Sequence, residues 1–115
     1  MPTEQEIANA DYGKYPDNYE KIIQNYMGCT KYSTLSCYFS DWKPPFKAYD
    51  YSKSPTVFGY GVCVKIGIFG SYEKGGVIYT QAGNLPHYFL IKNGSILRHY
   101  KHFDYIPKGA NFCKD

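Results

Sequence analysis

The sequence predicts an α+β domain in which one N-terminal helix packs on an antiparallel sheet of about four strands with a C-terminal hairpin. Three observations predict this fold: an apolar stripe of helical period over 14–27, apolar alternation over 57–69, and an Asn-Gly pair between two apolar runs over 88–100. The chain has 115 residues, which is enough for one modest core. No apolar run approaches the roughly 20 residues that a transmembrane helix requires, so a membrane-spanning helix is excluded.

The chain is expected to divide into a flexible N-terminal tether, residues 1–13, and a single α+β domain, residues 14–115. The first segment is acidic and polar and ends at Gly13. Within it, Ile7 to Asp11 could form a helical turn. The predicted helix follows as Lys14–Met27.

Local signals mark both ends of this helix. Pro16 suits the first helical turn, and Gly28 is a natural C-terminal cap. Its apolar residues recur with a period typical of a helix that buries one face. They are Tyr19, Ile22, Ile23 and Tyr26.

A short strand is predicted over 38–42, and the Pro44-Pro45 pair is expected to stop it. Residues 43–56 contain three prolines and are predicted to be a loop or an edge segment. The central strand is predicted over 57–69, because valines and isoleucines alternate there with smaller or charged residues. Gly59 and Gly61 in this strand indicate bends or a close approach of two backbones.

The last strands are predicted after a turn over 71–76. A strand is expected over 77–81, followed by a hairpin of residues 88–92 and 95–100. Asn93-Gly94 between them is the leading signal for a two-residue hairpin turn. The remainder, 104–115, is predicted to be an irregular tail.

The charge pattern is not typical of a nucleic-acid reader. The net charge is +3, and Arg98 is the only arginine among 13 basic residues. Nucleic-acid-binding domains usually cluster their basic residues and use arginine for bidentate contacts. The lysines here are spread along the chain, which favours a solubilising role.

The even number of cysteines, four, favours two disulfides in an exported domain. The short segment between Cys29 and Cys37 is easily closed, which would leave Cys63 to pair with Cys113. Because Cys63 lies in an apolar run, a buried free thiol is the alternative. The first six residues do not resemble a signal peptide. The chain is therefore either cytosolic or a mature exported form in which Met1 is only a start codon, and the cysteines favour the second interpretation.

No sequence pattern indicates an active site. The chain has no GxSxG elbow, HExxH helix or phosphate-binding loop. His87, His102 and Asp104 could be combined into a metal site, but their spacing does not single it out, and surface histidines on a hairpin are expected instead. We therefore expect no catalytic residue, no metal ligand and no cofactor, and we do not expect an enzyme.

Aromatic residues make up 19% of the chain and include 14 tyrosines. Tyr19, Tyr26, Tyr88 and Tyr100 fall in regular patterns, which predicts that they build the core. Aromatic residues in irregular segments are candidates for a partner-binding surface, because tyrosine and tryptophan are enriched in protein interfaces. A core built from tyrosine in a domain poor in leucine is the alternative that stays open. The predicted partner-binding residues are Trp42, Tyr49, Tyr51, Phe58, Tyr12 and Tyr15.

Four segments in order, DYG (11–13), YPDNYE (15–20), GYGVCV (59–64) and YFLIKNG (88–94), resemble small uncharacterised lipoproteins of Gram-negative bacteria. The resemblance implies export, lipidation on an N-terminal cysteine that Met1 would replace, and a place in the periplasm, anchored to the outer membrane. It implies no catalytic residue, and the family has no established function. Residues 29–37 depart from the family pattern, in which an Asp-Pro-Asp-Ser-like segment without cysteines is usual.

The function expected from these observations is protein–protein contact in the bacterial cell envelope. The protein would be an envelope or secretion-system component, or an inhibitor or immunity-type binder. Its membrane attachment would depend only on a lipid preceding this chain. The alternative is a cytosolic inhibitor, encoded by a phage or a bacterium, that binds a nucleoprotein or nucleic acid.

Overall fold

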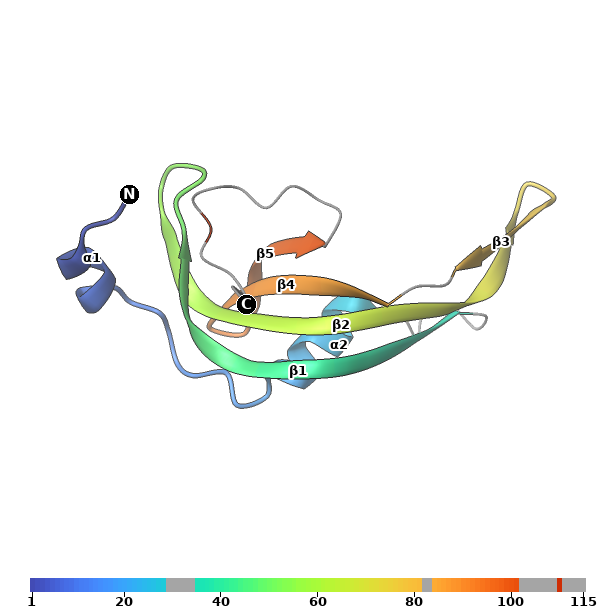
Figure 1. Ribbon diagram of the computed structural model, residues 1–115, viewed down its shortest axis with the longest axis horizontal. Coiled ribbons are helices and arrows are strands. Elements are labelled where there is room, and N and C mark those ends of the chain that lie inside the picture. Colours follow the sequence, from blue (N-terminus) through green and yellow to red (C-terminus); the bar gives the residue numbers. More distant parts are fainter. Residues whose placement is uncertain (29–34, 82–83, 102–109, 111–115) are drawn as a thin grey trace.

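The computed structural model describes residues 1–28, 35–81, 84–101 and 110. The described chain is mostly one antiparallel sheet with two short helices (Figure 1). The strands lie in the order β1-β2-β4-β5, and β3 pairs with the outer part of β2. The molecule is elongated, with extents of 55 × 28 × 25 Å. The elements are α1 (Glu4–Asn9), α2 (Tyr19–Met27), β1 (Leu35–Asp50), β2 (Val57–Lys74), β3 (Val77–Gln81), β4 (Asn84–Lys92) and β5 (Ser95–Lys101).

The prediction of a helix on an antiparallel sheet is therefore confirmed in outline. The helix on the sheet is α2, which begins at Tyr19 rather than at Lys14. It ends as predicted, because Gly28 adopts the left-handed conformation and its N–H donates to the carbonyl of Gln24. In the described part of the chain the sheet has five strands, one more than the number expected from the sequence.

Residues 43–56 were predicted to be a loop or an edge segment, and the edge-segment alternative is right for residues 43–50, whereas the predicted stop of the strand at Pro44-Pro45 is wrong. β1 continues through Pro44-Pro45 to Asp50. The pairing with β2 shifts register twice around Lys43, and Asp41 has a positive φ of 53° at the first shift. Because β1 is a terminal strand of the sheet, prolines at an irregular edge position remove no essential ladder hydrogen bond.

The predicted turn over 71–76 is also shorter than expected. β2 runs to Lys74 and turns back into β3 through Gly75-Gly76, both with positive φ. Glycine tolerates that conformation without strain, which fits a two-residue hairpin turn. The predicted hairpin of β4 and β5 is confirmed, and Asn93 and Gly94 form its turn with φ of 51° and 81°.

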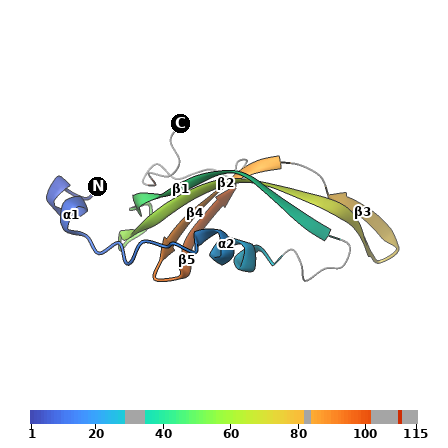
Figure 2. The same cartoon turned by 90° about the horizontal axis from the view of Figure 1, so that it is seen from below.

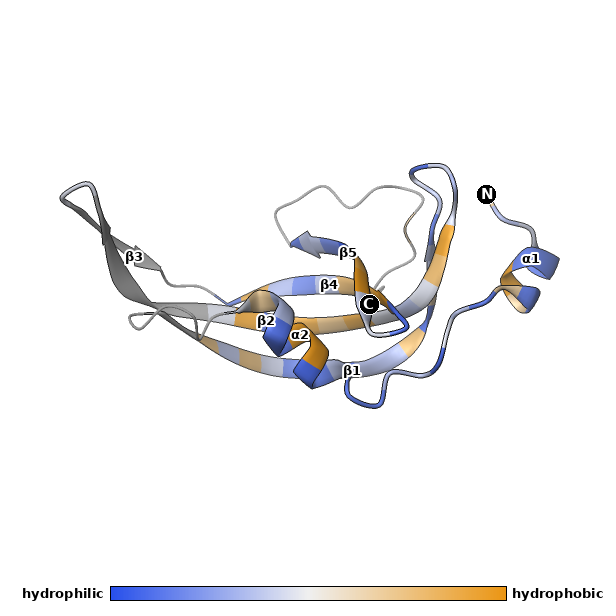
Figure 3. Cartoon of the chain, turned by 180° about the vertical axis from the view of Figure 1, so that it is seen from behind, coloured by the Kyte–Doolittle hydropathy of each residue, from blue (hydrophilic) through white to orange (hydrophobic). Residues whose placement is uncertain are grey.

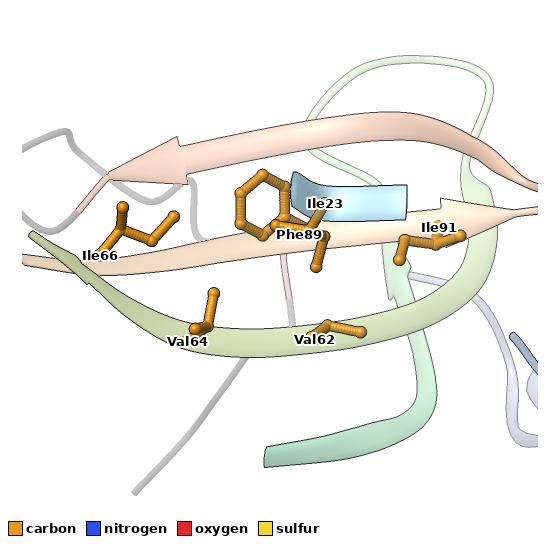
Figure 4. Packing of buried hydrophobic residues seen from close by; sticks show 6 residues of the cluster. All are labelled: Ile23, Val62, Val64, Ile66, Phe89 and Ile91. Atoms are coloured by element: carbon orange, nitrogen blue, oxygen red, sulfur yellow. The ribbon is translucent and has the colours of Figure 1, made fainter. Parts of the chain in front are cut away.

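The main core lies between α2 and the middle of the sheet (Figure 2). Ile23 is completely buried and is the buried residue of α2. Figure 4 shows it pointing into the space between Phe89 and Ile91 of β4, above the valines of β2. Figure 3 shows the apolar parts of α2 and the strands meeting in the middle of the molecule, with α1 apart from them. The buried cluster is Ile23, Val62, Val64, Ile66, Phe89 and Ile91.

A second, smaller core lies on the opposite face of the sheet. There the hairpin end of β1 and β2 bends back toward β5 (Figure 1), and Ala48 packs with Leu90. The bend needs glycine, as the sequence indicated. A Cβ at Gly59 would lie 2.6 Å from the carbonyl oxygen of Ile91, and one at Gly61 would lie 3.0 Å from the ring of Phe46.

The assignment of tyrosines to the core is right only in part. Tyr26 is 51% exposed, although its ring lies nearly perpendicular to those of Phe89 and His99 and in contact with them. Tyr12, which was assigned to an irregular surface segment, is 5% exposed. In the described residues, no helix is long and apolar enough to cross a membrane.

The Ile23→Ala variant should test the role of α2. Removing a fully buried side chain should destabilise the protein by roughly 2–5 kcal/mol, because the rigid sheet cannot close the cavity completely. Chemical denaturation followed by circular dichroism measures this loss. Ile7→Ala in α1, a helix without buried residues, is the matched control and should change stability by less than about 1 kcal/mol. Equal losses in the two variants would contradict the assigned core.

Candidate functional site

The predicted contact residues fall in two places. Trp42 stacks on Phe39 and meets Tyr19 edge-on, so it packs against the main core beside α2. The other five predicted residues, with Tyr60, form a continuous series of ring contacts at the hairpin end of β1 and β2. We call this group the hairpin aromatic patch: Tyr12, Tyr15, Tyr49, Tyr51, Phe58 and Tyr60.

Strand alternation explains why these rings share one face. Tyr49 pairs with Phe58 and Lys47 pairs with Tyr60 in the register of β1 and β2. Paired residues point to the same side of a sheet, and residues two apart along a strand do so as well. Phe58 and Tyr60 therefore continue the face on which Val62 meets α2.

Tyr12 is the centre of the patch. Its ring meets Phe58 at 5.6 Å and Tyr60 at 6.4 Å between ring centres, both edge-on, and the Nζ atom of Lys47 lies 5.3 Å from its centre. Its hydroxyl donates a 2.6 Å hydrogen bond to the carbonyl oxygen of Ile7. Burial, with smaller contributions from Tyr49 and Tyr60, raises the pKa of Tyr12.

The N-terminal segment, predicted to be a flexible tether, contains α1 and contacts the sheet at Tyr12. A capping box between Thr3 and Glu6 begins α1, and the following residues pack on the sheet through Tyr12. The sequence signal for α1 was present, because Thr followed by Glu three positions later is typical of a helix start. The burial of Tyr12 depends on groups distant in the chain and has no local signal.

The outer rings of the patch remain accessible. Tyr15 is 43% exposed and meets Tyr60 edge-on at 5.4 Å. Tyr49 lies 6.1 Å from Phe58 and 6.3 Å from Tyr51, and all three are half-buried. The patch therefore combines a buried centre with a partly exposed rim of tyrosines.

Asp50 fixes the strand end that carries Tyr49 and Tyr51. Its completely buried carboxylate accepts hydrogen bonds from the Ser52 N–H at 2.8 Å, the Arg98 Nε at 3.1 Å and the Tyr100 hydroxyl at 2.6 Å. Burial by itself raises the pKa of Asp50, but the bonds from Ser52 and Tyr100 and the charge of Arg98 outweigh it, so the pKa lies below its usual value. We call this group the Asp50 clamp: Asp50, Ser52, Arg98 and Tyr100.

The histidines are arranged differently from the prediction. His87 is 3% exposed, not on the surface, and its Nδ1 lies 2.8 Å from the Nε2 of His99 on β5. The ring centres are 5.1 Å apart and the planes differ by 24°, a spacing that fits two imidazoles joined end to end by one hydrogen bond. The period-two match of His87 with Phe89 and Ile91 was a usable signal for its burial.

The pair packs against Phe89 and Tyr26. His102 and Asp104, the other members of the metal site considered from sequence, lie outside the described residues. Within the described ranges, no group of three or more His, Cys, Asp or Glu side chains could hold a metal ion.

Cys37 and Cys63 lie within the described strands, and neither is a free thiol. The alternative of a free thiol at Cys63 is therefore wrong. Cys37 of β1 is paired with Ile68 of β2. Cys63 lies five residues before Ile68 on β2, so the two cysteines are far apart in the register of the two strands. Cys29 and Cys113 lie outside the described residues, and the pairing of the four cysteines stays a prediction.

Comparison with protein-family models, with curated proteins and with solved structures finds no match to this chain.

The Asp50→Asn variant should lose stability at neutral pH. It leaves the partly buried Arg98 without its counter-charge, and we expect a loss of roughly 2–4 kcal/mol, reduced from a fully buried pair because the arginine is 23% exposed. Because the pKa of Asp50 is lowered on folding, its contribution is complete above the unfolded pKa of about 3.9 and is lost as the pH falls through the lower folded pKa.

Thermal unfolding should therefore be measured between pH 7 and pH 2. The wild type should lose more stability over this range than Asp50→Asn does, because the variant has no carboxylate to protonate at this position. Asp41→Asn is the matched control: its ion pair with Lys65, at 3.2 Å, is exposed and should contribute less than about 1 kcal/mol. An Asp50→Asn variant with the stability and acid response of the wild type would show that the clamp is not stabilising.

Proposed function

We propose that this chain is a non-catalytic exported protein that acts through protein–protein contact in the bacterial cell envelope, with the hairpin aromatic patch as its contact surface. The observation that carries the proposal is the patch itself, a series of six aromatic rings with a buried centre and a partly exposed rim. Rings of this kind provide large contact areas at low cost in side-chain entropy.

The rigidity of the patch supports this proposal. The Asp50 clamp holds the strand end that carries Tyr49 and Tyr51. A surface that is already ordered loses less conformational entropy when a partner binds. Tyrosine is among the residues enriched at the interface positions that contribute most to binding energy.

Export is supported by the cysteines of the described strands. Disulfides persist in oxidising compartments, and neither Cys37 nor Cys63 is a free thiol. In this proposal, a lipid on a residue preceding the chain would attach it to the outer membrane. Within the envelope it would be an assembly component, or an inhibitor or immunity-type binder.

The cytosolic nucleic-acid-binding alternative is less well supported. Its best phosphate-binding group would be Arg98, the only arginine of the chain. The Nε of that arginine is bonded to Asp50 and its Nη1 donates to the carbonyl of Leu97, so the guanidinium serves the clamp. Phosphate contacts would therefore depend on lysines alone.

Affinity capture with the full-length protein tests the contact surface. Wild type, Tyr15→Ala and Tyr51→Ala would be immobilised and exposed to envelope extract treated with nuclease. The alanine variants should recover about tenfold less of the bound partner, since an interface tyrosine is worth more than about 1.4 kcal/mol. Tyr38→Ala is the matched control, because Tyr38 is 61% exposed on a part of β1 distant from the patch.

Equal recovery by all four proteins would argue against the patch as the contact surface. A partner that is lost on nuclease treatment would instead favour the nucleic-acid alternative. The folded state of each variant would be checked by circular dichroism before capture.

A further inference from the structure

The three residues Asp11, Tyr12 and Gly13 contact the body of the protein in the manner of a bound peptide. Tyr12 meets residues of β1 and β2, and Asp11 and Gly13 both meet the start of the β4–β5 turn. We propose that this site binds an Asp-Tyr-Gly turn of a partner protein, and that the chain's own residues 11–13 occupy the site when no partner is bound. This inference rests on the proposed function and specifies the chemistry of the partner.

The tyrosine subsite lies on the face of the β1–β2 hairpin. Lys47 lies over one side of the Tyr12 ring at 5.3 Å, and the rings of Phe58 and Tyr60 meet it edge-on. Edge-on aromatic pairs and a nearby ammonium both favour an electron-rich aromatic ring over an aliphatic side chain. Tyr12 is 5% exposed, so the subsite encloses a whole tyrosine side chain.

The position before the tyrosine favours an acidic residue. The carboxylate of Asp11 lies 3.9 Å from the Nζ of Lys92 and is 82% exposed, so this contact is weak and easily exchanged. The same carboxylate accepts a 2.9 Å hydrogen bond from the N–H of Gly13. That bond closes an Asx turn, which presents the tyrosine between two fixed neighbours.

The position after the tyrosine favours glycine. Gly13 has a φ of 79°, and a Cβ on it would lie 2.8 Å from the Oδ1 of Asn93 and 3.1 Å from the Cγ of Lys92. The backbone conformation would strain a larger residue, and a Cβ would also require the side chains of Asn93 and Lys92 to move. The site thus distinguishes three successive positions by charge, by ring chemistry and by size.

The segment preceding these residues is held less firmly. α1 contains no buried residue, and Figures 1 and 2 show it projecting away from the sheet. The only hydrogen bond from this turn to α1 is that of the Tyr12 hydroxyl to Ile7 within the described residues. A partner that presents the same turn could therefore replace residues 11–13 without disrupting the core beneath α2.

Peptide binding to the full-length protein tests this inference. The probe is a fluorescent synthetic peptide with the sequence of residues 6–15, followed by fluorescence anisotropy. It should bind the Tyr12→Ala variant at least tenfold more tightly than the wild type, because the wild-type site is occupied most of the time by its own segment. Tyr38→Ala, which leaves the segment intact, should bind like the wild type.

Altered peptides test each position. Replacing the tyrosine with alanine should abolish binding, replacing the aspartate with lysine should weaken it about tenfold, and replacing the glycine with alanine should also weaken it strongly. If Tyr12→Ala does not fold, Gly13→Ala provides the second variant. The Gly13→Ala variant retains every aromatic ring but should release the turn of residues 11–13 from its site. It should therefore bind the peptide more tightly than the wild type, as expected for Tyr12→Ala.

Failure of the parent peptide to bind a folded Tyr12→Ala or Gly13→Ala variant would overturn the inference. Equal binding of the tyrosine and alanine peptides would do so as well. Dimerisation of the wild type through exchange of its N-terminal segment, measured by light scattering, would overturn it in favour of a second copy as the occupant. These results are independent of the affinity-capture experiment with the Tyr15→Ala and Tyr51→Ala variants. The proposed function could therefore be correct even if this inference is wrong.

Discussion

The rest of the architecture depends on the hydrogen bonds and the ion pair that the fully buried carboxylate of Asp50 makes with Arg98 and Tyr100. This carboxylate connects the end of β1 with Arg98 and Tyr100 of β5, two strands that lie at opposite ends of the hydrogen-bonded order. A buried charge is tolerated only when it is paired and fully hydrogen-bonded, which is the case here. The sheet can therefore bend sharply at Gly59 and Gly61, and it encloses a small second core on the inner side of the bend.

The bend also creates the outer surface. Because side chains alternate along β1, Asp50 points inward while its neighbours Tyr49 and Tyr51 point outward. The N-terminal segment then covers part of this outer face through Tyr12 and continues the layer that α2 begins. One strand end thus supplies both the clamp on the inner side and aromatic rings on the outer side. This arrangement explains how a small domain uses so many tyrosines, since their rings pack while their hydroxyls reach polar groups or solvent.

The features that could be predicted from sequence depend on neighbouring residues. The Asn93-Gly94 turn, the Gly28 cap and the burial of Ile23 follow from conformational preference and periodicity. The same reasoning placed the central strand and the need for glycine in it. Each of these signals depends only on residues within a few positions of one another. The structure that it predicts is therefore independent of the rest of the fold.

The features that were missed depend on the position of an element within the sheet. Pro44-Pro45 ends a central strand but is tolerated in a terminal one, and the order of strands is not readable from a single sequence. Tyr12 is buried by Lys47 and Phe58, which are distant in the chain. Trp42 was grouped with Tyr49 and Tyr51 by proximity in sequence, but the two register shifts of β1 direct it to the core beside α2.

The same irregular stretch of β1 has a consequence for association in concentrated solution. A long terminal strand exposes backbone groups that can template the addition of another strand, which is the first step toward fibrils. Pro44-Pro45, the left-handed Asp41 and the exposed charges of Lys43 and Lys47 interrupt this template in its centre. The irregular stretch offers an added strand no continuous run of donors and acceptors, so we expect it to oppose edge-to-edge association.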